Sequence, residues 1–484
     1  MKLFIGIALL SASIVFSTSC ESPQTEKNPE TEIINSLMPE SYTGDVVPEY
    51  NLMERMEYWD VPAVSFAVID NMEIIYSGAF GVKKIGDTIP INSSTLFQAA
   101  SVSKPVTATG AMTFIEQGLL NPESDINNYT GEWQLSYDKF EGPVTMHQLL
   151  SHSGGLNVGG FTGYWSEDNL PELTDILNGT PPANSPGVKI VHEPGKKFMY
   201  SGGGYQVIQQ IMQNTSGMSF YDVMKEKVFN PAGMKNSYYA PLDSAQKLNA
   251  VYGHTEAGAI PEYGPIHIES AAGGLWTTPG DLGLMLIDMM RAYQGQKSKI
   301  LNTESIHKMM TPGFWNFGYG YRVQGEGKDL RFSHGGATIG WHSNFIAFPE
   351  RGQAVVVMTN GTNGWVLWPE IERAVAKYLN WPILKPKHIA AVELSEKQYN
   401  EYQGLYDMHG VKASISESNN LFTFKGAGLE WHFIPVAPDT LELLDLEGQI
   451  IFKRDKNDNI SGINLWVGEP EWSPYRAWDF IKSE

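Results

Sequence analysis

The sequence predicts an α/β domain followed by a small all-β domain, and three observations lead to this prediction. The chain has 484 residues, more than one hydrophobic core usually serves, so two domains are expected. Strand-like and helix-like segments are mixed up to about residue 385, whereas short β-like runs follow one another beyond residue 395. Hydrophobic residues make up 42% of the chain, which indicates a globular protein rather than a disordered one.

The charge and the motifs that are missing exclude several classes of function. A formal net charge of -20 argues against a nucleic-acid partner, because phosphate binding needs clustered Lys and Arg. The eleven histidines are scattered without metal-ligand spacing, so no metal is expected. No phosphate-binding loop is found, and "SGGGY" lacks the glycine pattern of a dinucleotide site. We therefore expect no cofactor.

The first residues, "MKLFIGIALLSASIVFSTSC", predict export. Lys2 precedes an apolar run over residues 3–16 and then small residues, which is the layout of a secretory signal peptide over residues 1–19. The run is too short to span a membrane comfortably. Its end at Cys20, the one cysteine of the chain, resembles a bacterial lipoprotein signal with acylation of that sulfur. The alternative is ordinary cleavage that releases a soluble protein.

The segment after Cys20 and the first domain can be assigned from local patterns. Residues 20–44 are polar at first and predict a flexible tether, and residues 45–385 form the first domain. Two strands joined at Asp70-Asn71 predict a hairpin. Further predicted segments are helices at 102–120, 219–229, 278–293 and 369–380, loop over most of 151–205, and two strands joined by a turn at 350–352 within 342–360.

The C-terminal residues 395–484 predict a small antiparallel barrel or sandwich. Six short β-like runs, from "ASISES" to "ISGINLWV", are separated by turn residues. Residues 386–394, at the centre of a stretch with two prolines and two lysines, are predicted as the linker between the domains.

Four Ser-x-x-Lys pairs occur in the chain, and their surroundings separate one from the rest. Spacing decides nothing, because residues three apart on a helix can touch. The segment "SVSK" opens an apolar run without a charge until Glu116, so Lys104 is predicted to be partly buried. Burial disfavours the ammonium form, which suits a lysine that acts as a base for Ser101. The other pairs lie in polar surroundings: Ser136 with Lys139, Ser244 with Lys247, and Ser305 with Lys308.

Two distant segments supply possible partners for this pair. Tyr200 lies in a glycine-rich turn just before a helical pattern, from which a phenol can project into a cleft. His334, Gly335 and Gly336 precede a strand, and the two glycines allow a substrate backbone to come close. The alternatives are a tyrosine packed on its loop and a plain hairpin turn with an exposed histidine.

Together, "SVSK", "YSG" and "HGG" in this order resemble the serine β-lactamase and penicillin-binding superfamily. Within it, the resemblance is closest to class C β-lactamases, D-aminopeptidases and esterases, and "LLSHSGGL" and "AAGGLWTTPGDL" are also similar to that branch. The resemblance implies an antiparallel sheet flanked by helices and a mostly helical subdomain. Residues 395–484 resemble the lipocalin-like β-barrel that follows some of these hydrolases, with "YQGLY" near their start.

The resemblance also implies roles for the site residues. Ser101 would attack a carbonyl, Lys104 and Tyr200 would move protons, and His334 would orient Tyr200 or the substrate. The backbone N–H groups of Ser101 and Ala337 would hold the oxyanion. Gly202, Gly335 and Gly336 would contact the substrate.

Two positions depart from the family pattern where the substrate is held. Gly202 stands where the family usually carries an Asn that holds an acylamino group. His334 replaces a lysine that pairs with a substrate carboxylate, so a fixed positive charge is missing. Both changes argue against β-lactam hydrolysis as the native activity.

Three functions follow as hypotheses. The first is a cell-envelope serine hydrolase acting on a peptide, a D-amino-acid derivative or a small ester, anchored to a bacterial membrane only through its N-terminal lipid. The second is a penicillin-binding D,D-carboxypeptidase or weak β-lactamase. The third is a catalytically silent binding lipoprotein, against which the intact Ser101, Lys104 and Tyr200 argue.

Overall fold

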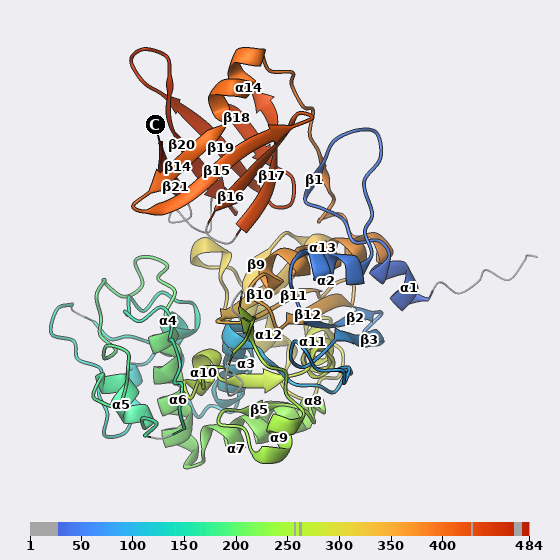
Figure 1. Ribbon diagram of the computed structural model, residues 1–484. Coiled ribbons are helices and arrows are strands. Elements are labelled where there is room, and N and C mark those ends of the chain that lie inside the picture. Colours follow the sequence, from blue (N-terminus) through green and yellow to red (C-terminus); the bar gives the residue numbers. More distant parts are fainter. Residues whose placement is uncertain are drawn as a thin grey trace, which may run out of the picture.

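The computed structural model (Figure 1) describes residues 28–483, except 141, 168, 256–257, 261–263, 427–428 and 469–476. The predicted signal peptide, residues 1–19, and the predicted lipidation site, Cys20, lie outside the described residues. A search of the described residues finds no helix with the length and apolar character that a membrane crossing requires.

An antiparallel sheet of six strands is the centre of the first domain. The predicted hairpin around Asp70-Asn71 is confirmed, because its two strands pair from Ala63 with Gly81 to Asp70 with Glu73. In spatial order the strands are β3 (Glu73–Gly81), β2 (Ala63–Asp70), β12 (Gln353–Thr359), β11 (Trp341–Phe348), β10 (Arg331–Thr338) and β9 (Arg322–Gln324). Since β9 pairs with β10 only as far as Ser333, the rest of β10 lies at the edge of the sheet.

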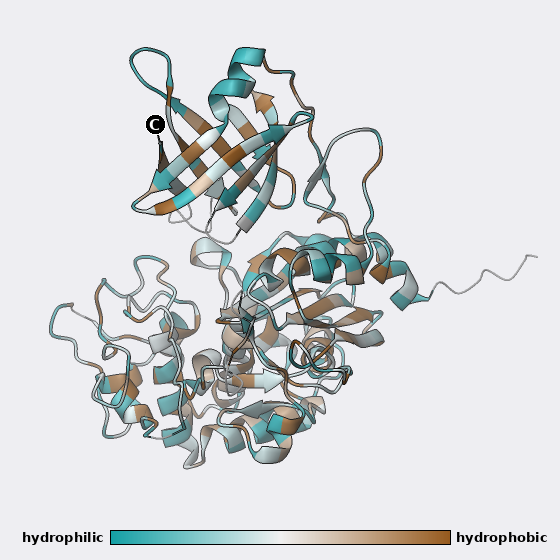
Figure 2. Cartoon of the chain, viewed as in Figure 1, coloured by the Kyte–Doolittle hydropathy of each residue, from teal (hydrophilic) through white to brown (hydrophobic). Residues whose placement is uncertain are grey.

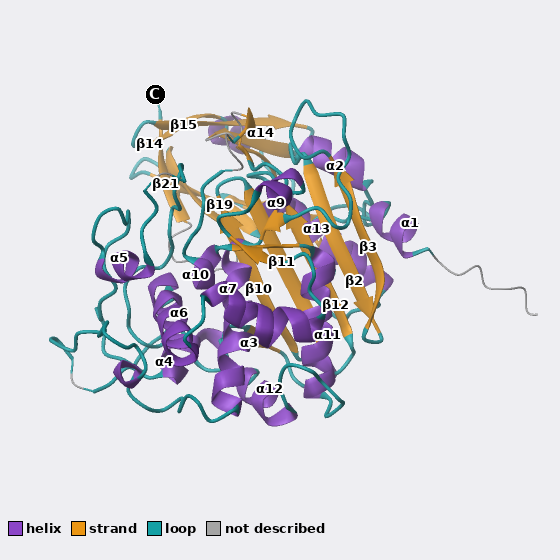
Figure 3. Ribbon diagram, turned by 90° about the horizontal axis from the view of Figure 1, so that it is seen from below, coloured by secondary structure: helices purple, strands orange, loops and turns teal. Residues whose placement is uncertain are grey.

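Both faces of this sheet are covered by helices (Figure 3). Successive side chains of a strand point to opposite faces. In β12, Val356 packs toward α11 (Pro279–Tyr293), while Val355 and Val357 pack toward α13 (Gly364–Tyr378). Burial on both faces explains why these strands have nearly continuous apolar sequences rather than an alternating pattern.

Helices and loops make up most of the region between the hairpin and β9. Its central helix, α3 (Ser103–Glu116), has its first twelve residues buried, as expected for a helix that is apolar on all sides. A small sheet of β4 (Phe97–Gln98), β8 (Leu275–Thr277) and β5 (Tyr238–Tyr239) lies in the same region. The other helices are α4 (Met146–Leu150), α5 (Leu173–Asn178), α6 (Gly202–Ser216), α7 (Phe220–Met224), α8 (Asn230–Ala232), α9 (Ser244–Leu248), α10 (Ser270–Gly273) and α12 (Thr303–Met309).

Two predicted helix boundaries differ from the structure. The helix in the stretch 102–120, predicted to end at Gly118, ends at Glu116, and Gly118 then adopts a positive φ of 72°, a conformation open to glycine. The helix predicted from Pro369 begins five residues earlier, at Gly364, and contains Pro369 in its interior. Proline favours a first helical turn, and here the apolar packing of the preceding turn outweighs that preference.

Part of the predicted tether is folded, which corrects that expectation. Helix α1 (Pro29–Ile34) begins after an N-cap at Asn28. The side chains of Ile33 and Leu37 are fully buried against the same core as α13. Strand β1 (Ser41–Tyr42) pairs in parallel with β13 (Lys387–His388), which lies within the predicted linker. A polar composition predicted flexibility because it does not reveal the few apolar side chains that anchor the segment.

The C-terminal residues form a closed antiparallel barrel of eight strands. Bands of hydrophobic and hydrophilic residues alternate along them (Figure 2), because one face of each strand is turned inward. Pairing of Tyr406 with Lys482 closes the barrel. The strands are β14 (Gly404–Met408), β15 (Val411–Ser418), β16 (Leu421–Gly426), β17 (Leu429–Ala437), β18 (Thr440–Leu443), β19 (Gly448–Arg454), β20 (Ile460–Val467) and β21 (Ala477–Lys482). The predicted fold is confirmed: an antiparallel sheet flanked by helices, with a mostly helical subdomain, is followed by a small β-barrel.

Ionic contacts join the barrel to the first domain. Arg55, on α2 (Leu52–Tyr58), forms a buried pair with Glu370 of α13 through Nη2 and Oε1, 2.5 Å apart. The same Nη2 lies 3.7 Å from Oδ1 of Asp445 in the barrel. The Tyr58 hydroxyl lies 3.3 Å from Nδ1 of His432 on β17. These contacts fix the barrel against α2 and α13.

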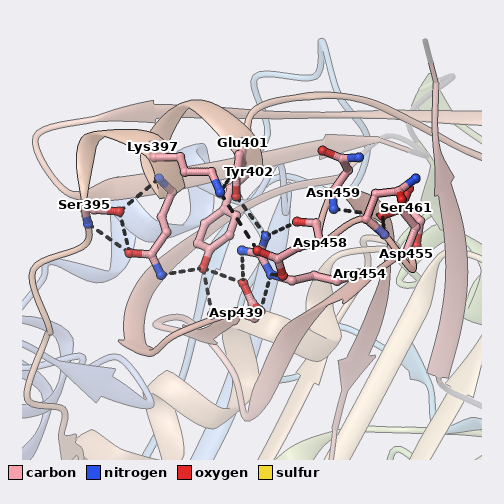
Figure 4. A network of polar contacts seen from close by, with 12 residues as sticks. Ser395, Lys397, Glu401, Tyr402, Asp439, Arg454, Asp455, Asp458, Asn459 and Ser461 are labelled. Atoms are coloured by element: carbon pink, nitrogen blue, oxygen red, sulfur yellow. Dashed lines mark hydrogen bonds and ion pairs between the residues drawn. The ribbon is translucent and has the colours of Figure 1, made fainter.

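A polar network holds α14 (Glu396–Tyr402) to the barrel (Figure 4). Arg454 donates two hydrogen bonds to the carboxylate of Asp439, each 2.7 Å long. Its Nη1 donates to Oε2 of Glu401 at 3.0 Å. The Tyr402 hydroxyl donates to Oδ1 of Asp439 at 2.8 Å. Two-pronged, charge-assisted bonds of this kind are stronger and more directional than neutral ones.

Replacing Arg454 with Met should therefore destabilise the barrel by about 2 kcal/mol, because it removes several charge-assisted hydrogen bonds. The measurement is the free energy of unfolding from urea denaturation. Lys453→Met is the matched control, since Lys453 and its partner Asp479 have side chains that are 49% and 66% exposed and such pairs contribute about 0.5 kcal/mol. Equal losses of unfolding free energy in the two variants would show that the network contributes no more than an exposed ion pair.

Candidate active site

Ser101 and Lys104 are in contact at the start of α3. Ser101 lies in a short 3-10 turn, Ala100–Val102, that connects β4 to α3. The ammonium of Lys104 donates to the Ser101 hydroxyl at 3.2 Å and to the carbonyl oxygen of Ala272 at 2.8 Å. The lysine side chain is buried, with 2% of its surface exposed. Ala100 adopts a positive φ of 46°, so the turn that presents Ser101 is strained.

The other three Ser-x-x-Lys pairs have different surroundings. Ser136 and Lys139 are both exposed. Lys247 is paired with Glu167. Ser305 donates to Glu116, while Lys308 is exposed. Among the described residues, a lysine–serine hydrogen bond is recorded for the Ser101 pair and not for these three.

Tyr200 lies beside this pair. The Lys104 ammonium is 4.8 Å from the centroid of its ring, a distance at which a cation is attracted to an aromatic face. The Tyr200 ring also lies 4.3 Å from the ring of His152 and 6.3 Å from that of His334. In the part of the chain that the structure describes, the Tyr200 hydroxyl has no hydrogen-bond partner. It is therefore available to a substrate.

His334 is neutral and its tautomer follows from its contacts. Its Nδ1 lies 2.6 Å from the carbonyl oxygen of Gly335, and because a carbonyl only accepts, Nδ1 carries the proton. Burial, together with the nearby charge of Lys104, lowers the pKa of His334 to about 3. Its Nε2 is buried without a protein partner in the described structure, so it offers a lone pair.

His152 is a further histidine at the site, whose role the sequence did not suggest. Its Nδ1 accepts a hydrogen bond from the backbone N–H of Ser201 at 3.1 Å, so the proton is on Nε2. Burial and the charge of Lys104 lower its pKa well below the usual value. The two neutral histidines near Tyr200 therefore have opposite tautomers. The one available signal was the segment "LLSHSGGL", noted for its resemblance to the family.

Strand β10 approaches the Ser101 turn very closely at Gly336. A Cβ atom on Gly336 would lie 2.3 Å from the carbonyl oxygen of Ala99 and 3.1 Å from the nitrogen of Ser101. The hydroxyl of Ser343, on the neighbouring strand, donates to the same Ala99 carbonyl at 2.8 Å. Ala337 follows Gly336 and lines the same cavity as Ser101. This contact requires glycine at position 336.

Gly202 occupies a different position from the other predicted site residues. It is the first residue of α6 and is packed, with its Cβ position 3.0 Å from the ring of Phe161. It is not among the residues that line the cavity at Ser101, whereas Tyr200, Gly335 and Gly336 are.

The cavity at Ser101 has a volume of about 830 Å³. It extends around the free edge of β10, from the Ser101 side to the face of the sheet covered by α13. The barrel closes one side of it. The lining residues beyond those already named include Phe317, Arg322, Arg331, Asn344, Trp365, Trp368, Glu372 and Arg373 from the first domain, and Leu446, Glu447, Val467 and Gly468 from the barrel. Among the described residues, no group of three metal-binding side chains is found.

The fold and the arrangement around Ser101 are those expected for a β-lactamase-like protein, and comparison with known families gives the same class. The model of the Beta-lactamase family matches residues 53–380, and the chain belongs to that family. Penicillin-binding protein 4* of Bacillus subtilis is 24% identical over 387 residues, which are 74% of this chain and 82% of the relative. Protein flp of Staphylococcus aureus (strain MRSA252) is 21% identical over 368 residues, 74% of this chain and 69% of the relative.

Solved structures share the fold across most of the chain. The octameric penicillin-binding protein homologue from Pyrococcus abyssi has a TM-score of 0.61 and 20% identity, with 89% of this chain and 98% of that chain covered. SurE with D-Leu has a TM-score of 0.55 and 18% identity, with 89% and 97% covered. The predicted resemblance is thus confirmed, and the chain is a member of a family of serine hydrolases.

Gly336→Ala should disrupt the contact between β10 and the Ser101 turn. We expect a loss of about 1 to 3 kcal/mol in unfolding free energy, because neither backbone can give way easily. Gly335→Ala is the matched control, since its Cβ would meet its nearest atom, Oδ1 of Asn344, at an ordinary 3.4 Å. Urea denaturation of both variants checks the prediction, and equal stabilities would contradict it.

The neutrality of His334 predicts how stability depends on pH. Its folded pKa lies below the unfolded value of about 6.5, so the unfolded chain binds a proton more readily. The stability contributed by the neutral ring is complete above pH 6.5 and is lost as the pH falls toward 3. Between pH 7 and 4.5, the wild type should lose about 2 kcal/mol more unfolding free energy than His334→Gln. Parallel pH curves for the two proteins would contradict this.

Proposed function

We propose that the protein is a serine hydrolase that cleaves an amide or ester bond of a peptide, a D-amino-acid derivative or a small ester through an acyl-enzyme on Ser101. The observation that supports this most directly is the buried Lys104 ammonium, 3.2 Å from the Ser101 hydroxyl. A structural serine–lysine pair would normally lie at the surface, because burying an ammonium without a function is costly.

The proposed reaction has two steps. For this step the Lys104–Tyr200 pair must hold one proton fewer than an ammonium beside a neutral phenol. The pair then takes the proton of the Ser101 hydroxyl as Oγ forms a bond to the substrate carbonyl carbon. The oxyanion lies between the backbone N–H groups of Ser101 and Ala337, which typically contribute about 3 kcal/mol each. The bond to the leaving group breaks as Tyr200 returns the proton to it. A water molecule, activated by the same pair, then hydrolyses the ester and restores Ser101.

Within this proposal, the two histidines position Tyr200. The ring of His152 lies 4.3 Å from that of Tyr200, and His334, with an unpartnered lone pair on Nε2, offers an acceptor near the phenol. Because both imidazoles are neutral, they guide the phenol without adding a second positive charge beside Lys104.

A penicillin-binding D,D-carboxypeptidase is the second candidate. The relative from Bacillus subtilis is named a penicillin-binding protein, and the SurE structure contains D-Leu. Both names favour a substrate related to D-amino acids. We further propose export and lipid anchoring at Cys20, on the basis of the N-terminal sequence.

Ser101→Ala should abolish labelling by a fluorophosphonate probe, because the probe forms a bond with the nucleophilic oxygen. Ser136→Ala is the matched control: it removes a serine of the same sequence pattern at an exposed position, and labelling should be unchanged. Undiminished labelling of Ser101→Ala would disprove the assignment.

A substrate panel would then divide the hypotheses. Hydrolysis of a short p-nitrophenyl ester that disappears in Ser101→Ala would exclude a silent binding protein. Nitrocefin, D-Ala p-nitroanilide and muropeptides would separate the hydrolase from the D,D-carboxypeptidase.

A further inference from the structure

One wall of the active-site cavity combines an aromatic ring with a buried carboxyl group. Trp368 and Glu372 lie four residues apart on α13, so they are on the same face of the helix. Both line the cavity that contains Ser101. Neither residue has a role in the reaction proposed above.

The carboxyl group of Glu372 is held in place by a neutral partner. Oε1 accepts a hydrogen bond of 2.6 Å from the Nδ2 of Asn344, on β11. The residue is 3% exposed, and burial raises the pKa of its carboxyl to about 7. In the described structure no cation lies within ion-pair distance of it.

The charge of the neighbouring Arg373 offsets part of the effect of burial on the pKa of Glu372, but no ion pair joins these two described residues. Arg373 is bound through Nη1 to Glu40 at 2.5 Å and through Nε to the carbonyl oxygen of Met38 at 2.8 Å. Its ion pair is therefore made with Glu40. A buried carboxylate without a paired cation is costly, and the cost is recovered when a cation binds.

Two glycines of β10, Gly335 and Gly336, lie between Ser101 and the wall formed by Trp368 and Glu372. The Cβ position of Gly336 is 3.1 Å from the nitrogen of Ser101. The Cβ position of Gly335 points to the opposite face, 3.4 Å from Oδ1 of Asn344 and 3.7 Å from Cη2 of Trp368. Neither glycine places a side chain between the nucleophile and the wall, and this part of β10 is a free edge, around which one cavity is lined by Ser101, Trp368 and Glu372.

The position of Trp368 and Glu372 relative to β10 indicates which part of the substrate they would contact. Tyr200, which the proposed reaction assigns to the leaving group, lies near His334, whose side chain is on the face of β10 opposite to Trp368. We therefore assign a group that reaches Glu372 to the acyl part of the substrate.

We propose that Glu372 and Trp368 form a subsite for a protonated amine on the acyl part of the substrate, with Asn344 holding the carboxyl group in position. The carboxylate accepts hydrogen bonds from the ammonium, and the indole face attracts the same charge. The substrate class is then an amino-acyl or peptidyl amide or ester with a free amino group. This inference rests on the proposed hydrolase function and adds a substrate class to it.

The test compares substrates that differ only in the amine. The p-nitroanilides of D-alanine, β-alanine and γ-aminobutyric acid are paired with isosteres in which a methyl group replaces the amino group. The wild type should hydrolyse at least one amine with a kcat/KM at least about 10-fold above that of its isostere. An equal or higher kcat/KM for every isostere would overturn the proposal.

Glu372→Gln keeps the shape and an acceptor for Asn344 but removes the charge. It should lower kcat/KM for the preferred amine at least about 10-fold and leave its isostere within about two-fold. Equal losses for both substrates would assign Glu372 a purely structural role and overturn the proposal. Glu54→Gln, at an exposed glutamate of α2 that does not line this cavity, is the control and should change neither substrate. A selective loss in Glu54→Gln instead would also overturn it.

A binding measurement separates this inference from the catalytic proposal. Calorimetry on Ser101→Ala requires no turnover, so it remains valid if the protein does not hydrolyse the anilides. The amine should bind Ser101→Ala at least about 10-fold more tightly than its isostere, and Glu372→Gln added to Ser101→Ala should abolish the difference. Equal binding of amine and isostere by Ser101→Ala would overturn the subsite, whether or not Ser101 is the nucleophile.

Discussion

The site depends on an ammonium group that is buried without a carboxylate. Lys104 is held by a carbonyl oxygen, a hydroxyl group and an aromatic ring, and no ion pair to it is found among the described residues. Such contacts compensate part of the cost of removing the ammonium from water. Burial, and secondly the charge of Lys104, keeps His152 and His334 neutral. The site therefore combines one buried ammonium with two neutral imidazoles near Tyr200.

That arrangement requires the sheet and the helical region to meet without a gap. Gly336 brings β10 against the Ser101 turn, and Ser343 binds the turn at Ala99 from the next strand. Ala272, at the other side, fixes the ammonium from α10. Since the nucleophile lies in a strained turn, its position is maintained by these three contacts rather than by local preference. The apolar side chains on both faces of the sheet pack against helices, which makes the sheet that carries β10 rigid.

Sequence patterns predicted those structural features that are determined by residues close together in the chain. The hairpin, the buried helix after Ser101, the barrel strands and the family were all accessible, because hydrophobic periodicity and short motifs are local signals. Patterns did not reveal contacts between distant segments. His152 is adjacent to Tyr200 only in three dimensions, and Gly202 lies in a motif but packs on Phe161 away from the cavity. Helix α1 was missed because its few buried side chains follow a polar stretch, and Glu372 was part of an ordinary amphipathic helix.

The barrel also acquires a role that its sequence could not suggest. Leu446 and Val467 contribute to the wall of the active-site cavity, although they follow Ser101 by more than three hundred residues. Asp445, next to Leu446, is the residue that Arg55 approaches from the first domain, and Arg55 is itself paired with Glu370 on α13. The helix that carries Trp368 and Glu372 is therefore tied through one arginine to the loop that closes the cavity. Because both walls are fixed by the same charged group, a change in how the barrel docks would change the space available to the acyl part of a substrate while leaving Ser101 and Lys104 in place.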